Sequence, residues 1–304
     1  MIVHVLGSGA GGGFPQWNCN CRNCDGLRRG TLRARARTQS SLAISADRRS
    51  WVLLNASPDI RAQLDACPAL QPGGPVRNTA IRAVVLMDSQ IDHVTGLLSL
   101  REGRRLAVHC TAQVHTDLTS GLPLFDVLRH YLELELTIID PDQAAGFTVA
   151  GVDGLTFHAI ALTSKAPPYS PHRHAPARGD NLGVLVRDQQ SGRTLFYAPG
   201  LGELDARVRA LLAEADCALI DGTFWSDDEM ATAGISQKRG REMGHLALSG
   251  AGGMLEELAQ LPPRRRILIH INNTNPILDE DSAARRELDA RGIEVAWDGM
   301  EIAL

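Results

Sequence analysis

The sequence predicts an α/β fold in which two β-sheets pack back to back and helices cover both outer faces, a four-layered αβ/βα sandwich. In the N-terminal half of the 304 residues strands come first and helices follow, and this order recurs in the second half. Several predicted strands are short apolar runs, which is typical of strands buried between layers. No internal repeat or low-complexity tail divides the chain, so we expect a single domain over residues 1–304.

Strands are predicted where residues alternate in polarity or run apolar between polar breaks. In chain order these strands fall at residues 2–6, 40–45, 51–55, 81–87, 106–110, 134–139, 147–149, 155–162, 182–187, 194–197, 217–221, 266–270 and 293–297. Helices are expected near residues 59–64, 94–101, 204–213, 253–261 and 280–291, with helical stretches after residue 110 up to about residue 131. Irregular sequence is expected from the cysteine-rich stretch to Arg37 and in the Pro/Gly-rich loop 68–75.

Composition excludes several classes of protein. Apolar residues make up 44% and charged residues 22% of the chain, as in ordinary soluble proteins. No apolar run approaches the roughly 20 residues that a bilayer span needs, so no membrane helix is predicted. The N-terminus lacks the pattern of a secretory signal, which favours a cytoplasmic location. The formal net charge of −4 disfavours a nucleic-acid partner, because nucleic-acid binders are usually basic.

The six cysteines are unevenly placed. Cys19, Cys21 and Cys24 lie in one short stretch, whereas the other three are scattered and are expected to be small buried apolar residues. Three thiolates on one turn suit a structural zinc site, which needs a fourth ligand from elsewhere. The alternative is a reduced cysteine turn that holds no metal.

Polar residues with metal-binding side chains follow two of the buried strands. Asp88, Gln90, Asp92 and His93 come after the strand at residues 81–87, and His270 ends the strand at residues 266–270. Ligands and cofactors usually collect at such strand ends in α/β folds. Taken alone, an Asp-His pair after a strand is often only a capping carboxylate with a hydrogen-bonded histidine.

The segment Asp88-Ser-Gln90-Ile-Asp92-His93 resembles the metallo-β-lactamase superfamily motif His-x-His-x-Asp-His, with its two leading histidines replaced. No histidine stands near residues 162–165, where the superfamily has its lone one. Pro199 and Gly200 stand where its bridging Asp falls. The resemblance implies that one metal site of the usual pair is lost and that Asp92, His93 and His270 keep the other. One carboxylate and two imidazoles are the ligand composition of non-haem Fe(II) oxygenases, so oxygenation is favoured over hydrolysis.

Two further residues are candidates for catalysis. His245 matches a histidine of the superfamily's phosphodiesterase branch and could act as an acid-base group or a fourth metal ligand; the alternative is a packing histidine. A helix N-terminus beside His245 would lower its pKa and keep it neutral. Asp88 could take a proton from a phenol or orient a water. Asp88 could equally be an outer hydrogen-bond partner of His93 or His270.

Motifs along nearly the whole chain add a closer resemblance. GSGAGGGFPQWNCNCRNC, MDSQIDHVTGLLSLREG, SPHRHAPARGDNLG and HINNTNPILDE are similar to the B proteins of pyrroloquinoline quinone (PQQ) synthesis, a family within that superfamily. The resemblance implies either iron- and O₂-dependent hydroxylation of the tyrosine ring of a Glu–Tyr-derived precursor, or a soluble carrier that assists transport of PQQ or its precursor to the periplasm. A mononuclear zinc hydrolase is the third alternative.

The cofactors expected from this resemblance are Fe(II) at the Asp92, His93 and His270 site, where zinc could replace it in purified protein, and structural zinc at the cysteines. Asn273 occupies the position of the fourth cysteine-site ligand in a related phosphodiesterase. A homodimer is an open possibility. The loop at residues 164–181 contains four prolines, and we expect it to be a lid over the substrate, where it would exclude water.

Overall fold

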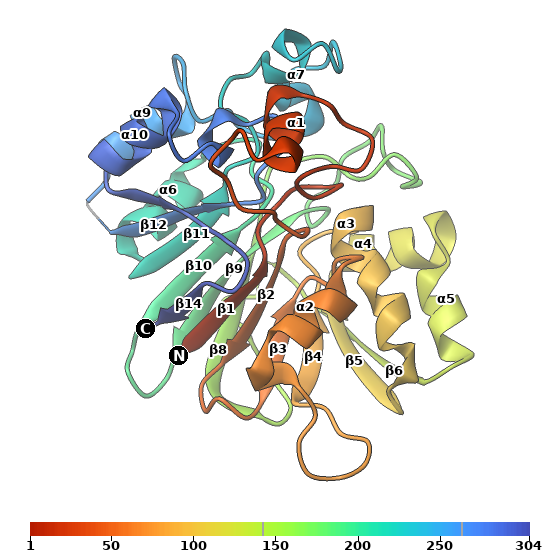
Figure 1. The fold of residues 1–304 in the computed structure, drawn as a ribbon. Coiled ribbons are helices and arrows are strands. Elements are labelled where there is room, and N and C mark those ends of the chain that lie inside the picture. The colour runs from red at the N-terminus through yellow and green to blue at the C-terminus, as the bar shows by residue number, and fades with distance from the viewer. Residues whose placement is uncertain (142, 263) are drawn as a thin grey trace.

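The computed structural model describes residues 1–141, 143–262 and 264–304 and contains two seven-stranded sheets flanked by helices (Figure 1). This architecture confirms the predicted sandwich. The first sheet has the order β14 (Glu301–Ala303), β1 (Ile2–Gly7), β2 (Ser41–Ser45), β3 (Trp51–Leu54), β4 (Ile81–Val85), β5 (Arg105–Cys110) and β6 (Glu133–Ile138). The second sheet has the order β13 (Ile293–Val295), β12 (Arg265–Ile269), β11 (Cys217–Asp221), β10 (Thr194–Ala198), β9 (Leu182–Asp188), β8 (Val152–Ala161) and β7 (Phe147–Val149).

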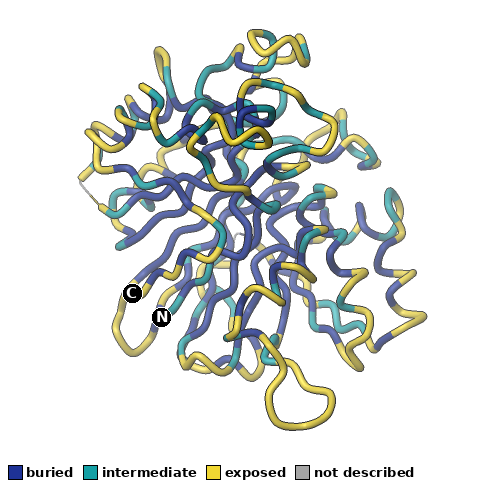
Figure 2. Tube along the Cα trace, viewed as in Figure 1, coloured by how far each residue is buried: buried dark blue, intermediate teal, exposed yellow. Residues whose placement is uncertain are grey.

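Three apolar layers hold the sandwich together. The central layer joins the inner faces of the two sheets, with Val85 of β4 and Ile269 of β12 among its members. A second layer lies between the second sheet and its helices, and a third between the first sheet and its helices. Figure 2 shows the strands buried and the peripheral loops exposed. Burial on both faces explains why these strands are nearly continuous apolar runs rather than alternating ones.

The helices lie outside the sheets (Figure 1). They are α1 (Arg22–Arg29), α2 (Ile60–Ala66), α3 (Ile91–Val94), α4 (Ala112–Thr116), α5 (Leu124–Arg129), α6 (Ala206–Glu214), α7 (Glu229–Thr232), α8 (Gly240–Met243), α9 (Met254–Ala259) and α10 (Ala283–Ala290), with η1 (Pro68–Leu70), η2 (Thr95–Glu102), η3 (Asp117–Gly121) and η4 (Pro276–Leu278) as 3₁₀ or π turns. Within the described ranges no helix combines the length and apolarity needed to cross a bilayer.

The structure corrects two local predictions and adds one strand that was not expected. The segment expected to be irregular up to Arg37 contains the helix α1, which ends at Gly30 in a left-handed conformation. The helix expected at residues 94–101 is mostly the 3₁₀ helix η2. Its Gly96 approaches the carbonyl oxygen of Ser57 so closely that a Cβ atom would lie 2.1 Å from it. The short edge strand β14 was not predicted from the sequence.

Parallel pairing sets the position of the candidate site. Strands β3 to β6 run parallel in the first sheet, and β10 to β13 run parallel in the second. The carboxyl ends of parallel strands meet at one edge of a sheet. Therefore the polar residues after β4, β11 and β12 approach one another between the two layers.

Candidate metal centre

Asp92, His93 and His270 converge where β4 and β12 end. The Nε2 atom of His270 lies 3.2 Å from Oδ2 of Asp92, and Nε2 of His93 lies 3.8 Å from the same oxygen. One ligand atom from each residue fits within a span of 4.8 Å. The structure thus brings together the three predicted ligands, which are 178 residues apart in sequence at their extremes.

Asp88 fixes the orientation of the His93 ring. Both carboxylate oxygens of Asp88 lie close to Nδ1 of His93, at 2.8 and 2.9 Å. Nδ1 therefore donates its proton to Asp88, which leaves Nε2 as the atom that would bind a metal ion. Nε2 is buried and has no hydrogen-bond partner, and a buried polar atom in that state needs an explanation. A metal ion at the trio supplies one, and this contact matches the outer-partner role considered for Asp88.

His270 is held in place by Thr223. Its φ angle is +58°, a left-handed conformation that is uncommon outside glycine and that clusters at functional sites. The Thr223 hydroxyl lies 2.6 Å from Oδ1 of Asp221 and 2.8 Å from Nδ1 of His270. This hydroxyl has one proton, which it donates to Asp221, so Nδ1 of His270 is the donor in the contact with Thr223. Nε2 of His270, which points at Asp92, is then the atom that would bind a metal ion.

The charges of the trio suit a cation. Burial would raise the pKa of Asp92, but His93 and His270 hold it well below its usual range. Burial would lower the pKa of His93, but the carboxylates of Asp88 and Asp92 raise it to about 9. Without a metal ion, the His93 ring therefore holds an extra proton between the carboxylates of Asp88 and Asp92. A bound metal ion would displace that proton.

A hydrogen-bonded pair of Asp221 and His245 lies beside the trio. Nδ1 of His245 is 2.6 Å from Oδ2 of Asp221, and the His245 ring stacks on that of His270 with centroids 5.4 Å apart. Asp221 is fully buried and also accepts the backbone N–H of Leu201 and of Thr223. The sequence placed Asp221 at a strand end but did not reveal its pairing with His245.

The prediction that a helix N-terminus lies beside His245 is wrong. His245 follows the C-terminal end of α8 rather than preceding a helix N-terminus. Burial lowers its pKa, but the carboxylates of Asp221, Asp92 and Asp88 together raise it, and the net shift is upward. His245 is therefore a stronger base than the sequence suggested.

The trio opens into a cavity of about 220 Å³. Its lining includes the three ligands, Asp88 and His245, together with Gly11 of the glycine-rich loop. A Cβ atom on Gly11 would lie 3.4 Å from the Asp92 carboxylate, so the glycine-rich loop passes directly beside this ligand. The loop at residues 164–181 has only turns and bends, as predicted, and contributes Ser164 and Asn181 to the lining.

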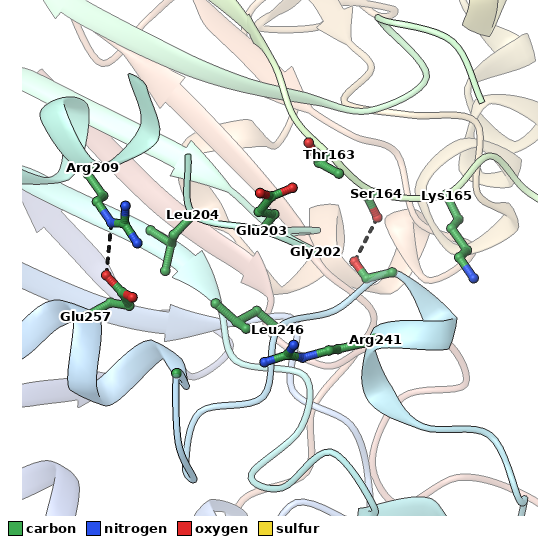
Figure 3. Close-up of a pocket in the computed structure, with 12 residues that line it drawn as sticks. Thr163, Ser164, Lys165, Gly202, Glu203, Leu204, Arg209, Arg241, Leu246 and Glu257 are labelled. Atoms are coloured by element: carbon green, nitrogen blue, oxygen red, sulfur yellow. Dashed lines mark hydrogen bonds and ion pairs between the residues drawn. The ribbon is translucent and has the colours of Figure 1, made fainter. Parts of the chain in front are cut away.

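A larger cavity of about 420 Å³ shares Ser164 with the lining of the metal cavity (Figure 3). The Ser164 hydroxyl donates to the Gly244 carbonyl oxygen at 2.8 Å, and both residues line the larger cavity. Gly244 has φ +94°, and a Cβ atom there would lie 2.6 Å from the Ser164 hydroxyl oxygen. Figure 3 shows the Arg241 guanidinium beside Leu246, while Arg209 is paired with Glu257.

The positions of the superfamily's other metal hold different groups here. Gln90 donates through Nε2 to the Lys165 carbonyl oxygen at 3.1 Å, and Pro199 has no ligand atom in its side chain. Among the described residues, the further acidic and histidine cluster in this region is Asp221, His245 and His270. It shares His270 with the trio, and its atoms are already engaged in the hydrogen bonds above. The arrangement favours one metal ion at this edge.

The second metal candidate is the cysteine cluster. The thiols of Cys19, Cys21 and Cys24 lie within 4.8 Å of one another. The Asn273 side-chain amide lies 3.1, 3.6 and 3.3 Å from the three sulfur atoms in turn. Asn273 thus donates N–H groups toward the sulfurs and lies over the cluster, as expected from its sequence position three residues after His270; its Oδ1 atom would have to face a metal ion to bind it.

Comparisons with known proteins agree with this geometry. The family described as "Beta-lactamase superfamily domain" matches residues 50–271. A "Coenzyme PQQ synthesis protein B" from Azoarcus sp. (strain BH72) is 62% identical, and one from Methylococcus capsulatus is 59% identical, each over the full length of both chains. The chain belongs to the coenzyme PQQ synthesis protein B family.

Solved structures extend the comparison. Zn(2+)-bound PqqB from Methylobacterium extorquens is 38% identical, with a TM-score of 0.90 over the full length of both chains. A diphosphatase of the PhnP family, at 17% identity and a TM-score of 0.67 over 99% of this chain and 96% of its own, shares the fold. The zinc-bound PQQ synthesis B relative and the clustered ligands together support metal binding by this chain.

Proposed function

We propose that this protein acts in PQQ biosynthesis and hydroxylates the tyrosine ring of a Glu–Tyr-derived precursor with Fe(II) and O₂. The observation that carries the proposal is the trio of one carboxylate and two imidazoles, whose Nε2 atoms lie 3.2 and 3.8 Å from the same oxygen of Asp92. That donor set leaves several coordination positions open for substrate and O₂. The family membership supplies the pathway.

Oxygen balance sets the requirements of the reaction. One oxygen atom of O₂ replaces a ring hydrogen and the other leaves as water, so two electrons and two protons must come from an external reductant such as ascorbate. Bound Fe(II) would supply the one-electron chemistry that lets O₂ react with an aromatic ring. The protein supplies geometry, proton transfer and exclusion of water.

Residues around the trio divide these tasks. Asp88 and Thr223 hold the Nδ1 protons of His93 and His270, so both rings keep Nε2 available. His245 offers its free Nε2 to the cavity and accepts the phenolic proton of the substrate, because Asp221 stabilises the protonated imidazole through Nδ1.

In this proposal the loop at residues 164–181 acts as a lid over the metal cavity. The Tyr169 hydroxyl donates to the Ser89 carbonyl oxygen, and the Lys165 carbonyl oxygen accepts from Gln90. Both contacts attach the loop to the segment that carries Asp88. A lid anchored beside the ligands would keep bulk water from a reactive oxidant.

The test is O₂ uptake by protein loaded with Fe(II), supplied with a cross-linked Glu–Tyr peptide and ascorbate. We expect uptake matched by a gain of one oxygen atom in the product by mass spectrometry. His93→Ala and His270→Ala should abolish both, whereas His130→Ala, at an exposed position, should leave them unchanged. Absence of turnover in protein with one iron per trio would contradict the proposal.

The same samples separate the alternatives. A carrier would bind PQQ tightly without changing it and would keep that binding in His93→Ala. A zinc hydrolase, an alternative favoured by the zinc in the Methylobacterium relative, would cleave an ester or amide without O₂ when loaded with zinc. Either result would replace the oxygenase assignment.

A further inference from the structure

A third cavity, of about 400 Å³, lies near α10 and β13, away from the metal trio. Three arginines and one tryptophan line part of its wall: Arg35, Arg37, Arg285 and Trp297. We call this cavity the arginine pocket. No residue of the trio or of the cysteine cluster belongs to its described lining.

Arg37 is the unusual residue of the arginine pocket. Its side chain is buried, with 6% of the residue exposed. Its Nη1 and Nη2 atoms donate to the carbonyl oxygens of Arg35 and Ala296, at 2.9 and 3.1 Å, and its Nε has no hydrogen-bond partner. Within the described part of the chain no carboxylate lies in ion-pair distance of this guanidinium. Buried charges are normally paired, so Arg37 is left in need of an anion.

Three carboxylates also line the pocket, those of Glu280, Asp289 and Glu294, but among the described residues none of them pairs with Arg37. Glu280 is paired with Arg33 at 2.9 Å and also approaches Arg35, while Glu294 forms a two-point contact with Arg265. Asp289 is 67% exposed and 3.9 Å from Arg285.

The other charges near Arg37 also leave its positive charge without a paired anion. Asp298 faces Arg37, but its oxygens already accept from Ser8 and Thr38. Burial lowers the pKa of Arg37 to about 10; Asp298 and Glu280 oppose the shift, and the positive charges of Arg285 and Arg35 add to it.

Trp297 gives the pocket a flat apolar surface. The residue is 37% exposed, and the Arg35 guanidinium carbon lies 4.9 Å from the centre of its ring. The exposed part of the ring, together with the guanidinium that lies over it, suits the stacking of a planar aromatic ring. The forked N–H groups of arginine suit carboxylates, which they bind at two points.

We propose that the arginine pocket binds a planar aromatic molecule bearing carboxylates, with its ring against Trp297 and its carboxylates toward Arg37 and Arg285. PQQ is itself an aromatic tricarboxylate, so it is the natural probe; this choice of probe, unlike the site, rests on the proposed function. The pocket is thus a second ligand site, distinct from the metal centre.

The backbone of Arg37 links the arginine pocket to the metal cavity. The backbone of Arg37 pairs with that of Phe14 through two hydrogen bonds of 2.7 and 2.8 Å. Phe14 follows the glycine-rich loop, whose Gly11 lines the metal cavity. Backbone hydrogen bonds therefore connect the arginine pocket with the segment that borders the metal cavity.

The test is calorimetric titration of the metal-loaded protein with PQQ, with benzene-1,2,4-tricarboxylate and with citrate, an aliphatic tricarboxylate. We expect both aromatic probes to bind and citrate to bind much more weakly. Arg285→Met and Trp297→Ala should each weaken the aromatic probes about tenfold, the scale of losing one charged or stacking partner. Arg37→Met keeps the apolar stem and should have at least the same effect.

Two controls keep the test decisive. Arg291→Met changes an exposed arginine just after α10 that does not line the pocket, and it should bind like the wild type. His93→Ala should also keep the binding, which distinguishes this pocket from the metal centre. Equal binding by all arginine-pocket variants, loss only in His93→Ala, binding of citrate as tight as that of the aromatics, or no binding at all would overturn the proposal. Each result is independent of whether O₂ uptake occurs.

Discussion

The two three-ligand clusters of this protein differ in how they are built, although one short segment serves both. The trio of Asp92, His93 and His270 lines a cavity, and hydrogen bonds from its two rings to Asp88 and Thr223 fix their orientation. The cysteine cluster has no place in that cavity's described lining and is covered by the Asn273 amide. Catalytic metal sites keep an open position, whereas structural sites are closed. The comparison therefore assigns chemistry to the first cluster and stability to the second.

The segment from His270 to Asn273 connects the two clusters. His270 belongs to the open site, and Asn273 contacts all three cysteine sulfurs. Asn23, which adjoins Cys24, also donates to the Asn273 carbonyl oxygen at 3.1 Å. A metal ion at the cysteines would thus fix the backbone that positions His270, so the closed site supports the open one without taking part in the reaction.

The largest expected effect is a difference in stability between a variant of the cysteine cluster and a variant of the trio. Cys24→Ser should remove the structural metal and lower the free energy of unfolding by several kcal/mol, because metal binding at such sites is coupled to folding. His93→Ala should instead abolish the metal of the trio and turnover, with a small effect on stability. Cys67→Ser, a buried thiol outside the cluster, is the control. Metal content and chemical denaturation measure both quantities, and equal stability losses in the two variants would break the comparison.

The next effect concerns Glu229. Its carboxylate accepts hydrogen bonds from the Trp225 N–H and from the hydroxyl of Thr274, the residue after Asn273. Burial raises its pKa from the ordinary 4.5 to about 7. The folded state therefore keeps a proton that the unfolded state releases, so stability falls as pH rises from about 4.5 to about 7. The loss is on the order of 3 kcal/mol. Glu229→Gln should flatten this slope in denaturation curves measured across that range; an unchanged slope would show that the carboxyl is ionised throughout.

A smaller effect tests the support of the open site. Asp88→Asn removes the charge behind His93 while keeping an acceptor for its Nδ1 proton. We expect metal affinity at the trio to fall by about 10- to 100-fold, the usual cost of losing such a partner, with the cysteine metal retained. Competition with a chelator measures the affinity, and the exposed Asp65→Asn is the control. An unchanged affinity would mean that Asp88 acts on the substrate instead.

The smallest effect concerns the cover of the cysteine cluster. Asn273→Ala should release zinc from the cysteines faster than the wild type does, whereas Asn273→Asp should retain it longer, since a carboxylate is a better zinc ligand than an amide. Zinc release to a coloured chelator follows the rate. Identical rates in all three proteins would show that Asn273 covers the cluster without supporting its metal.

Sequence patterns anticipated the layers and the ligands better than the contacts between them. The buried strands before Asp88 and His270 were recognisable because long apolar runs admit few alternatives. The three residues of the trio could be recognised as one ligand set only through the resemblance to known motifs. The Asp221–His245 pair was missed because the two residues come from different elements 24 positions apart, and one sequence holds no signal that joins them. Thr223 was missed for the same reason.

Local errors have tertiary causes as well. The 3₁₀ helix η2 replaces a predicted α-helix where Gly96 packs against the backbone of residues 56 and 57. The upward pKa shift of His245 depends on Asp221 rather than on a helix end. Both outcomes are decided by neighbours that a pattern in a single segment does not contain.

The most direct test of the account is diffraction from crystals of protein produced with abundant iron, recorded on both sides of the iron and zinc absorption edges. The account predicts anomalous signal from iron between Asp92, His93 and His270, and from zinc among Cys19, Cys21 and Cys24. Zinc in both clusters despite full iron supply, or a trio whose side chains hold no metal, would contradict it.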